Sequence, residues 1–286
     1  MKKIAAVTMA YNEPDFLPIW ARHYGAQVGA KHCYVVDHGS DDGSTEALGE
    51  VNIARIPRSP QDEERRARFI SRFCTSLLDW YDWVIYTDVD EIALPDPRFY
   101  ASFAEFCEVV VPEVVTAVGL NVQHVPAIEP PVDLARPVTE QRRWVRFSSA
   151  MCKAVLVRRA VEWAPGFHCV ADAPVVFDQL YLFHLRWFDR DAGLRRLAKT
   201  RSMAWSGLVM PWQVLSDAEL VAMIDAIAAL PRREGVAFDT GIPPLRDLIG
   251  TLLEGAKGRE HDRYKFDLTL DASELWEIPA RFRGTF

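Results

Sequence analysis

The sequence lacks a run of apolar residues long enough to cross a membrane. Its most apolar stretch, CEVVVPEVVTAVGL, is interrupted by Pro112 and Glu113 and is shorter than the roughly 20 residues that a transmembrane helix needs. The N-terminus MKKIAAVTMAYNEP begins with lysines as a signal peptide does, but its apolar run covers only Ile4 to Ala10 and leads into no cleavage site. We therefore expect a cytoplasmic protein without a transmembrane segment, for which peripheral membrane association stays open.

Cysteine is sparse and unpaired. The 5 cysteines lie singly in apolar surroundings, and no two of them form a Cys-x-x-Cys motif. An odd and scattered set of this kind is typical of reduced core thiols in a cytosolic protein and argues against a zinc site.

An excess of positive charge is also missing. The formal net charge of −7 over 286 residues argues against nucleic acid as the partner, because phosphate-backbone binding needs a basic face. A phosphorylated small molecule is not excluded, since a metal ion can supply the missing positive charge. The length allows one large α/β domain or a domain with appendages, and we find no internal repeat.

Strand and helix patterns alternate in the first half of the chain. The apolar segments KIAAVTMA, KHCYVVD, VNIARIP and DWVIYTDVDE predict strands. Between them, DFLPIWARHYGAQVG and QDEERRARFISRFCTSLLDW predict amphipathic helices, the second with Phe69, Phe73 and Leu77 facing inward. This alternation predicts an α/β fold with a mainly parallel sheet covered by helices on both faces.

The second half is less regular. VVTAVGLNVQHV, AMCKAVLV and QLYLFHLRWF predict further strands, and RDAGLRRLAKTRS predicts a helix. Another helix is expected in SDAELVAMIDAIAAL, where Ser216 and Glu219 form a capping box. We expect an α/β domain over residues 1–200 and a mostly helical C-terminal extension over residues 201–286 that packs on it.

Polar clusters follow three of the predicted strands. They are Tyr11-Asn12-Glu13, Asp37-His38-Gly39-Ser40 and Asp88-Val89-Asp90. Ligands of parallel sheets bind beyond the carboxyl ends of the strands, so these clusters are expected to converge at one edge. The convergence predicts an active site there.

The spacing of Asp88 and Asp90 indicates a metal site. On an extended strand end, residues two apart point to the same side, and two neighbouring carboxylates repel unless a cation lies near them. Mg²⁺ and Mn²⁺ prefer oxygen ligands, and Mg²⁺ is commonly held by one or two carboxylates plus substrate phosphates. A nucleotide diphosphate would complete such a site. An acidic turn at the surface is the plainer interpretation, and it would be preferred for Asp-x-Asp taken alone.

The segments VTMAYNEPDFLPIWARHY, VVDHGSDDGST and WVIYTDVDEI resemble, in order and spacing, the GT-A glycosyltransferases, and above all the family 2-like group with an Asp-Val-Asp-Glu signature. The resemblance covers roughly the first hundred residues; MCKAVLVRR, PGFH and LFHLRW resemble that subgroup more loosely. It implies a Rossmann-like GT-A catalytic domain over residues 1–200. It also implies transfer of a hexose from a nucleotide-diphosphate donor, such as a UDP-sugar, to a glycan or lipid-linked saccharide, as in polysaccharide biosynthesis. The implied cofactor is Mn²⁺ or Mg²⁺.

The resemblance also implies roles for individual residues. Those expected around the nucleotide are Thr8, Ala10, Asn12, Glu13, Asp37, His38 and Asp88. Those expected at the metal ion are Asp88, Asp90, His168 and His184. The ion would act as a Lewis acid on the departing diphosphate. Each of these histidines could instead be a buried structural residue whose imidazole makes one hydrogen bond.

Candidate catalytic residues come from the second half. Lys153 is expected to share the charge of the leaving group, with Arg186 and Lys199 as further candidates; each could also be a solvated surface charge. Inverting members of the fold place an acidic base in a Glu-Asp pair that opens a helix, and this sequence has no such pair. Asp172 and Asp178 are the nearest acids that could deprotonate an acceptor. Inversion and retention both remain open.

Rival functions also fit parts of the pattern. A haloacid-dehalogenase-like phosphatase or phosphotransferase would use Asp88 as the nucleophile, but its motif normally follows the first strand and not the fourth. A nucleotidyltransferase usually opens with a Gly-rich phosphate loop, which MAYNEP is not. A non-catalytic glycan-binding relative would stack tryptophans on sugars, although most tryptophans here lie in apolar patterns expected in the core.

Overall fold

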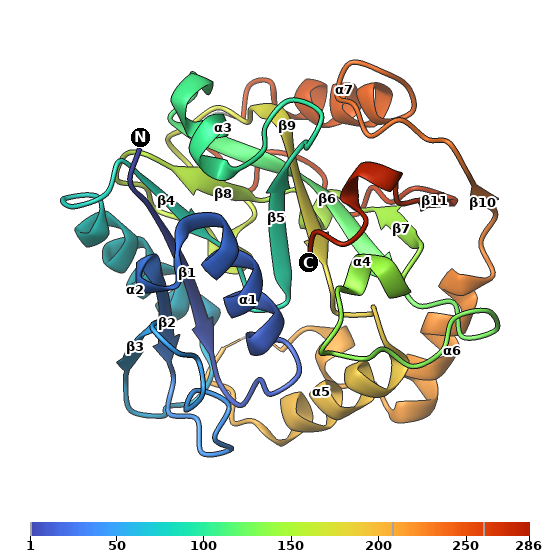
Figure 1. Cartoon of the computed structure of the whole chain (residues 1–286), viewed down its shortest axis with the longest axis horizontal. Helices are drawn as coiled ribbons and strands as arrows, with labels where there is room; N and C mark the ends of the chain where they lie inside the picture. The colour runs from blue at the N-terminus through green and yellow to red at the C-terminus, as the bar shows by residue number, and fades with distance from the viewer. Residues whose placement is uncertain (1, 208, 260) are drawn as a thin grey trace.

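The computed structural model describes residues 2–207, 209–259 and 261–286, and it has a mixed sheet with helices on both faces (Figure 1). The strands are β1 (Ile4–Ala10), β2 (Cys33–Asp37), β3 (Asn52–Arg55), β4 (Trp83–Tyr86), β5 (Glu91–Pro95), β6 (Val114–Gln123), β7 (Trp144–Phe147), β8 (Ala154–Val157), β9 (Phe177–His184), β10 (Arg232–Arg233) and β11 (Leu275–Glu277). The helices are α1 (Leu17–Val28), α2 (Glu63–Leu77), α3 (Phe103–Val109), α4 (Val138–Gln141), α5 (Arg190–Ser202), α6 (Asp217–Ala228) and α7 (Leu245–Ala256). The predicted α/β fold class is confirmed.

The strand order is β10-β11-β7-β6-β8-β4-β1-β2-β3. The part formed by β4, β1, β2 and β3 is parallel, as predicted, whereas β8 runs antiparallel to β4. Off this path, β9 pairs parallel with β6 and antiparallel with β5. The parallel strands therefore end at one edge, and β8 and β9 bring chain segments from the second half beside them.

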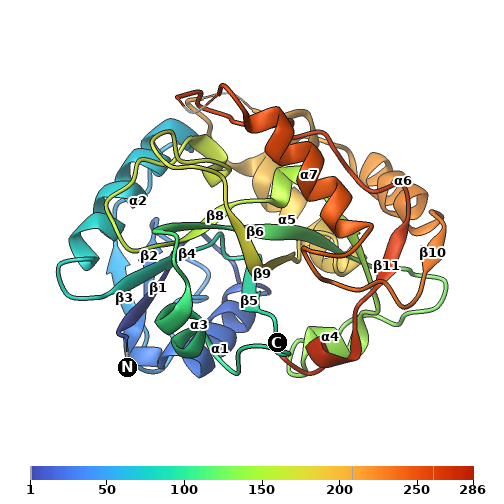
Figure 2. The ribbon, with the colours of Figure 1, turned by 90° about the horizontal axis from the view of Figure 1, so that it is seen from above.

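Both faces of β1, β2 and β4 are buried, and side chains alternate between the two faces along each strand, whereas the edge strand β3 is largely exposed. In β1, Ile4 and Ala6 belong to the core cluster that includes α1, whereas Ala5 and Val7 belong to the cluster that includes α2. Figure 2 shows α1 and α2 on opposite sides of the sheet. The near-continuous apolar pattern of the early strands follows from this double coverage.

Of the residues expected on the inward face of α2, Phe73 and Leu77 pack partly buried against the core, whereas Phe69 is turned outward. The helix buries Ala67, Ile70, Ser71 and Cys74, while Phe69 is 38% exposed and only stacks on its neighbour Phe73. The buried face is thus centred on Ile70 and Cys74, and Phe69 lies at its edge.

The C-terminal segment contributes strands as well as helices. The α6 capping box is present with both of its hydrogen bonds, as predicted for Ser216 and Glu219. Strand β11 pairs with β7, so that the sheet continues into residues 201–286. The division into a domain and an extension stays a prediction. Across the described ranges, no helix combines the length and the apolar character that a membrane crossing needs.

Candidate active site

The polar clusters after β1 and β2 come together at the carboxyl edge of the parallel strands. Ala10 is paired in register with Asp37, and the backbone N–H of His38 donates to the carbonyl of Ala10 at 2.9 Å. The backbone N–H of Asn12 donates to Ser40 Oγ at 3.0 Å, and the Asn12 amide donates to Asp41 at 2.7 Å. These contacts join the two loops into one wall of the site.

The Asp88-Val89-Asp90-Glu91 segment is a turn between β4 and β5. The backbone N–H of Glu91 donates to the carbonyl of Asp88 at 3.0 Å, and the Glu91 carboxylate accepts from the Asp88 backbone N–H at 3.0 Å. Val89 points into the core, as expected. The two aspartates are therefore spaced by a turn and not by an extended strand end, because β4 already stops at Tyr86.

Asp88 is bound by cations on both of its carboxylate oxygens. Arg66 from α2 contacts one oxygen, and Lys153 Nζ donates to the other at 3.0 Å. Lys153 also lies 2.5 Å from Glu91. Burial by itself would raise the pKa of Asp88, but Arg66 and Lys153 outweigh it and lower that pKa. Burial raises the pKa of Glu91, and Lys153 opposes that rise.

Register explains why Lys153 reaches this turn. It directly precedes β8, whose Leu156 is paired with Ile85 of β4 in an antiparallel ladder. In an antiparallel pair, moving three residues forward from Ile85 and three residues back from Leu156 places Lys153 opposite Asp88. Lys153 is therefore at the acidic turn, where its ammonium is bound by Asp88 and Glu91 and it is only 4% exposed, while its expected role at the leaving group stays a prediction.

Asp90 faces a different pair of partners. Arg196 of α5 contacts its Oδ2, and His184 Nε2 lies 3.1 Å from the same oxygen. The other ring nitrogen of His184 lies 2.6 Å from Asn121 Oδ1. Burial works to raise the pKa of Asp90, but Arg196 and His184 lower it well below its usual range. Asp90 is therefore an ionised carboxylate with an imidazole beside it.

Helix α5 carries two cations to the site, close to the edge at which β1 ends (Figure 1). Arg196 contacts Glu13 as well as Asp90, and Lys199 donates to the carbonyls of Tyr11 and Asn12 and to Glu13. Lys199 thus holds the loop after β1, in which Asn12 has a φ of +50°. The position of Lys199 is therefore explained by a structural role, which is to hold this loop.

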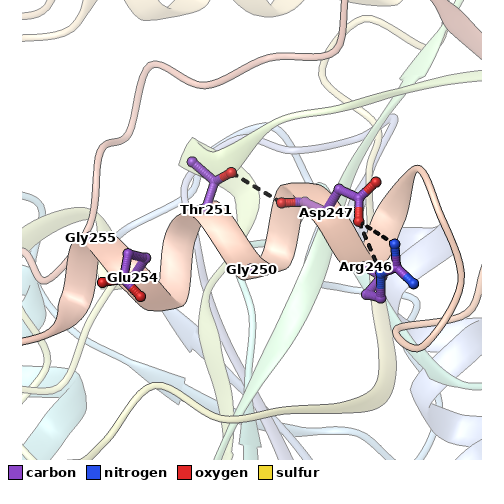
Figure 3. Close-up of a pocket in the computed structure, with 6 residues that line it drawn as sticks. All are labelled: Arg246, Asp247, Gly250, Thr251, Glu254 and Gly255. Atoms are coloured by element: carbon purple, nitrogen blue, oxygen red, sulfur yellow. Dashed lines mark hydrogen bonds and ion pairs between the residues drawn. The ribbon is translucent and has the colours of Figure 1, made fainter.

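A cavity of about 200 Å³ opens beside these groups. Its polar lining includes Asn12, Glu13, Asp42, Arg196 and Lys199. A more open depression lies along α7, where Figure 3 shows Asp247, Thr251 and their neighbours on one exposed helix face. The cavity by α5 is the better candidate for ligand binding, because it adjoins the buried carboxylates.

Arg186 lies close enough to Arg196 and Asp90 for their charges to change its pKa. It is half-buried with its guanidinium over the ring of Trp187, and burial and Arg196 lower its pKa to about 10. Within the described part of the chain, no ion pair to this guanidinium is found within 4.0 Å. It therefore stays cationic at neutral pH and able to bind an anion.

Asp37 and His38 are held by the turn after β2. Asp37 accepts from the backbone N–H of Ser40 at 2.7 Å and lies 3.4 Å from Arg55. Gly39, with a φ of +75°, makes this turn possible, and an added Cβ would approach Arg58 to 2.9 Å. His38 contacts Ser59 and Arg58, and burial followed by Arg58 lowers its pKa.

Some predicted residues are not brought to the site. Thr8 and Ala10 are 0% and 3% exposed, so that their side chains are enclosed by the protein, and their expected place at the nucleotide stays a prediction. Asp178 stands near the start of β9, six residues from His184, which at about 3.3 Å per residue is roughly 20 Å away. Asp172 is exposed and pairs with Arg159 at 2.9 Å.

Arg159 follows the end of β8, whose Val157 is paired with Val84 near the start of β4. Asp172 therefore lies toward the amino end of β4, opposite to Asp88. Neither Asp172 nor Asp178 is positioned as a base for chemistry at Asp90, because strand direction sets both at the far end.

His168 lies close enough to Lys153 and Asp88 to feel their charges. Burial and Lys153 lower its pKa to about 3, so that its ring is neutral at pH 7. Its Nδ1 is buried and lacks a hydrogen-bond partner in the described structure. A neutral ring with an unused nitrogen is compatible with the predicted ligand role, which stays a prediction.

The carboxylates and imidazoles near the acidic turn are the possible ligands of a divalent cation. In the residues that the structure describes, no three His, Cys, Asp or Glu side chains are gathered closely enough to hold a metal alone. Asp90 and His184 do provide an ionised oxygen and an imidazole nitrogen side by side. Two protein ligands with phosphate oxygens and waters are a usual shell for Mg²⁺ or Mn²⁺, so this pair fits such an ion, which would take the place of Arg196 at Asp90 Oδ2. Asp88 fits less well, because Arg66 and Lys153 contact both of its oxygens.

Sequence reasoning missed Arg66, Arg196 and Asn121. Arg66 and Arg196 occur in charged helical segments, in which no pattern distinguishes a buried arginine from a solvated one. Asn121 did carry a signal, because it is a polar residue within the otherwise apolar strand pattern VVTAVGLNVQHV.

No protein-family model matches the sequence, and a comparison with curated proteins finds no match. Solved structures similar in part include glucosyl-3-phosphoglycerate synthase from Mycobacterium tuberculosis with Mn²⁺, UDP and glucosyl-3-phosphoglycerate, at 17% identity and a TM-score of 0.30, over 45% of this chain and 47% of that one. S. aureus TarS is similar at 12% identity and a TM-score of 0.35, over 78% of this chain and 43% of that one.

A mannosyltransferase from Pyrobaculum calidifontis, with GDP-Man and Mn²⁺, is similar at 13% identity and a TM-score of 0.38, over 87% of this chain and 79% of that one. The chain spans less than half the length of the synthase and of TarS. All three TM-scores are below 0.5, so these similarities do not assign an activity.

Proposed function

We propose that this chain is a metal-dependent glycosyltransferase with a GT-A-like sheet. It transfers a sugar from a nucleotide-diphosphate donor, for which a UDP-sugar is the first choice, to a glycan or lipid-linked saccharide. The observation that carries the proposal is the meeting of Asp90 and His184 at the carboxyl edge of β1, β2 and β4. The resemblance of the three strand-end motifs to GT-A enzymes supports the same function.

In this proposal Asp90 and His184 hold Mn²⁺ or Mg²⁺, which as a Lewis acid stabilises the negative charge of the departing diphosphate. Arg186 binds a phosphate oxygen, since it is cationic and near enough to Asp90 to feel its charge. Asn12 lies on the loop that binds the nucleoside, and the buried carboxylate of Asp37 at the end of β2 holds the neighbouring loop through Ser40. Lys153 and Arg66 keep Asp88 ionised and orient the turn.

The phosphatase alternative fits the geometry less well. An aspartate nucleophile needs a free carboxylate oxygen directed at the phosphorus atom. Both oxygens of Asp88 are bound, one by Arg66 and the other by Lys153. The glycan-binding alternative is weakened by burial of Trp83, Trp144 and Trp163 in the core.

The first prediction concerns Asp90→Asn. We expect this variant to lose at least about 100-fold of the Mn²⁺-dependent hydrolysis of a UDP-sugar, because the amide removes the charged ligand of the ion. Wild-type protein should be stabilised in a thermal melt by UDP with Mn²⁺ more than by ATP with Mn²⁺, since a selective ligand shifts unfolding by mass action. Coupled detection of released UDP measures the hydrolysis.

Asp247→Asn is the matched control, because Asp247 is exposed on α7 and its loss should leave hydrolysis unchanged. Circular dichroism and the ligand-free melt establish that Asp90→Asn is folded. The proposal fails if wild-type protein responds neither to UDP nor to GDP in the presence of Mn²⁺. A response to beryllofluoride alone would support a phosphatase.

A further inference from the structure

We propose that the outward side of α2 is a docking surface for an anionic lipid membrane. This α2 outer face consists of Arg65, Arg68, Phe69 and Arg72. The docking goes beyond the proposed function and does not depend on it, because it needs neither a metal ion nor a nucleotide.

The period of the helix places these side chains together. Arg65, Arg68 and Arg72 are spaced three and four residues apart, so that they follow one another along one side of α2. The opposite side is buried, with Ile70 and Cys74 in the core, and Figure 2 shows α2 as the outer layer on its side of the sheet. The three arginines are exposed and extend over about 10 Å of helix at 1.5 Å per residue.

The arginines of the α2 outer face lack anionic partners. Among the residues that the structure describes, no carboxylate forms an ion pair with any of the three guanidinium groups. The acids of the first turn are engaged elsewhere. Asp62 caps the helix by accepting from its backbone, Glu63 binds Arg66, and Glu64 binds Arg263. Three cations thus project unpaired from one side of a chain whose net charge is −7.

Exposed aromatic side chains accompany these charges. Phe69 is 38% exposed and lies about one turn from both Arg65 and Arg72. Trp80, just beyond the C-terminal end of α2, is 79% exposed, and Asp79 before it is the exposed acid of this end. Arginines with phenylalanine or tryptophan are typical of helices that lie on a membrane, because the cations bind anionic headgroups while the rings enter the acyl boundary.

Shape favours a membrane over a nucleic acid, which also carries phosphates. The α2 outer face is the convex side of a helix, and a membrane presents a flat layer of negative charge to it. Single-stranded nucleic acids are instead bound in basic grooves with aromatic side chains on which the bases stack. The observations therefore favour a lipid surface as the partner.

Docking through α2 brings the candidate active site to the lipid surface. Arg66, next to Arg65 in the chain, contacts Asp88 of the acidic turn. A membrane on the α2 outer face therefore lies roughly one helix diameter, about 10 Å, from that turn. This position selects a lipid-linked saccharide over a free glycan as the acceptor, and that step alone rests on the proposed function.

Sedimentation of the full chain with vesicles tests the docking. Wild-type protein should bind vesicles of phosphatidylcholine with phosphatidylglycerol but not vesicles of phosphatidylcholine alone, and added salt should weaken the binding. The triple variant Arg65→Gln/Arg68→Gln/Arg72→Gln should bind about 100-fold more weakly, since each arginine near an anionic surface contributes roughly fivefold. Glutamine has a helix propensity close to that of arginine, so the helix should be kept.

Arg232→Gln/Arg233→Gln/Arg246→Gln is the matched control. It removes the same charge at exposed positions on β10 and α7, and it should bind the anionic vesicles as wild-type protein does. Phe69→Ser should weaken vesicle binding several-fold, because the ring no longer enters the acyl boundary. Hydrolysis of a UDP-sugar in the absence of vesicles should be unchanged in the α2 triple variant.

Three results overturn the inference: wild-type protein sediments with neither kind of vesicle, it binds both kinds equally, or the two triple variants bind alike. Binding of a fluorescent single-stranded oligonucleotide in place of the anionic vesicles also overturns it, in favour of a nucleic-acid partner. None of these results bears on hydrolysis of the UDP-sugar, so a failure of the docking and a failure of the proposed function are distinguished.

Discussion

At the scale of single residues, burial controls the protonation of His23. His23 is 3% exposed, with Nε2 at 2.9 Å from the carbonyl of Ala93, and burial lowers its pKa to about 4. An unfolded histidine titrates near 6.5. Between these values the unfolded chain binds a proton that the folded chain excludes, so that stability falls as the pH decreases through this window.

We expect His23 to account for a loss of about 2 kcal/mol in the free energy of unfolding between pH 7.5 and pH 5. His23→Gln should remove this part of the pH dependence, whatever it does to the stability at pH 7.5. Urea denaturation at a series of pH values measures the slope. His261→Gln, at an exposed position, should keep the wild-type slope; equal slopes in His23→Gln and wild-type protein would contradict the assignment.

At the scale of elements, α5 depends on one aspartate at its start. Asp189 Oδ1 accepts from the backbone N–H groups of Asp191 and Ala192, and Oδ2 accepts from Val132 and from the buried guanidinium of Arg142 at 2.9 Å. The side chain of Asp189 therefore both caps α5 and forms the ion pair with Arg142. Through α5 they also position Arg196, which contacts Asp90.

Asp189→Asn should cost about 3 kcal/mol of unfolding free energy, because it keeps the cap but leaves Arg142 buried without its anion. Asp189→Ala should cost about 1 kcal/mol more, since it also removes the cap. Ser216→Ala, at the exposed start of α6, measures a cap alone and should cost about 1 kcal/mol. Chemical denaturation of the three variants tests this order, and equal costs for Asp189→Asn and Ser216→Ala would refute it.

At the scale of the whole molecule, the C-terminus closes the core. Phe282 is fully buried, and its ring lies 5.5 Å from Tyr181 and 5.3 Å from Phe183, both on β9. Arg281 contacts Asp96 after β5 at 2.8 Å. The last residues of the chain are thus packed on the two strands that carry Glu91 and His184.

Phe282→Ala should lower the free energy of unfolding by about 3–5 kcal/mol, because it removes a fully buried ring from an aromatic cluster. Phe99→Ala, at a position that is 55% exposed, should cost less than about 1 kcal/mol. Denaturant titration compares the two variants. A cost for Phe282→Ala no greater than for Phe99→Ala would show that the C-terminus is not part of the cooperative core.

Sequence alone determined strands β1–β4, β6, β8 and β9, helices α1, α2, α5 and α6, and the edge at which polar residues gather. Strands and helices have distinct periods, Ser216 and Glu219 form a local cap, and parallel strands present their carboxyl ends together, so local rules were sufficient. The choice of Lys153 as the basic candidate of the second half also came from the sequence, and its catalytic role stays a prediction.

Only the tertiary structure decided which groups meet. Arg66, Arg196 and Asn121 reach the carboxylates through α2, α5 and the β6–β9 register, and none of these contacts is local in sequence. Strand direction likewise removed Asp178 from the site. Pairing between distant segments depends on the whole packed chain, so no window of sequence contains it.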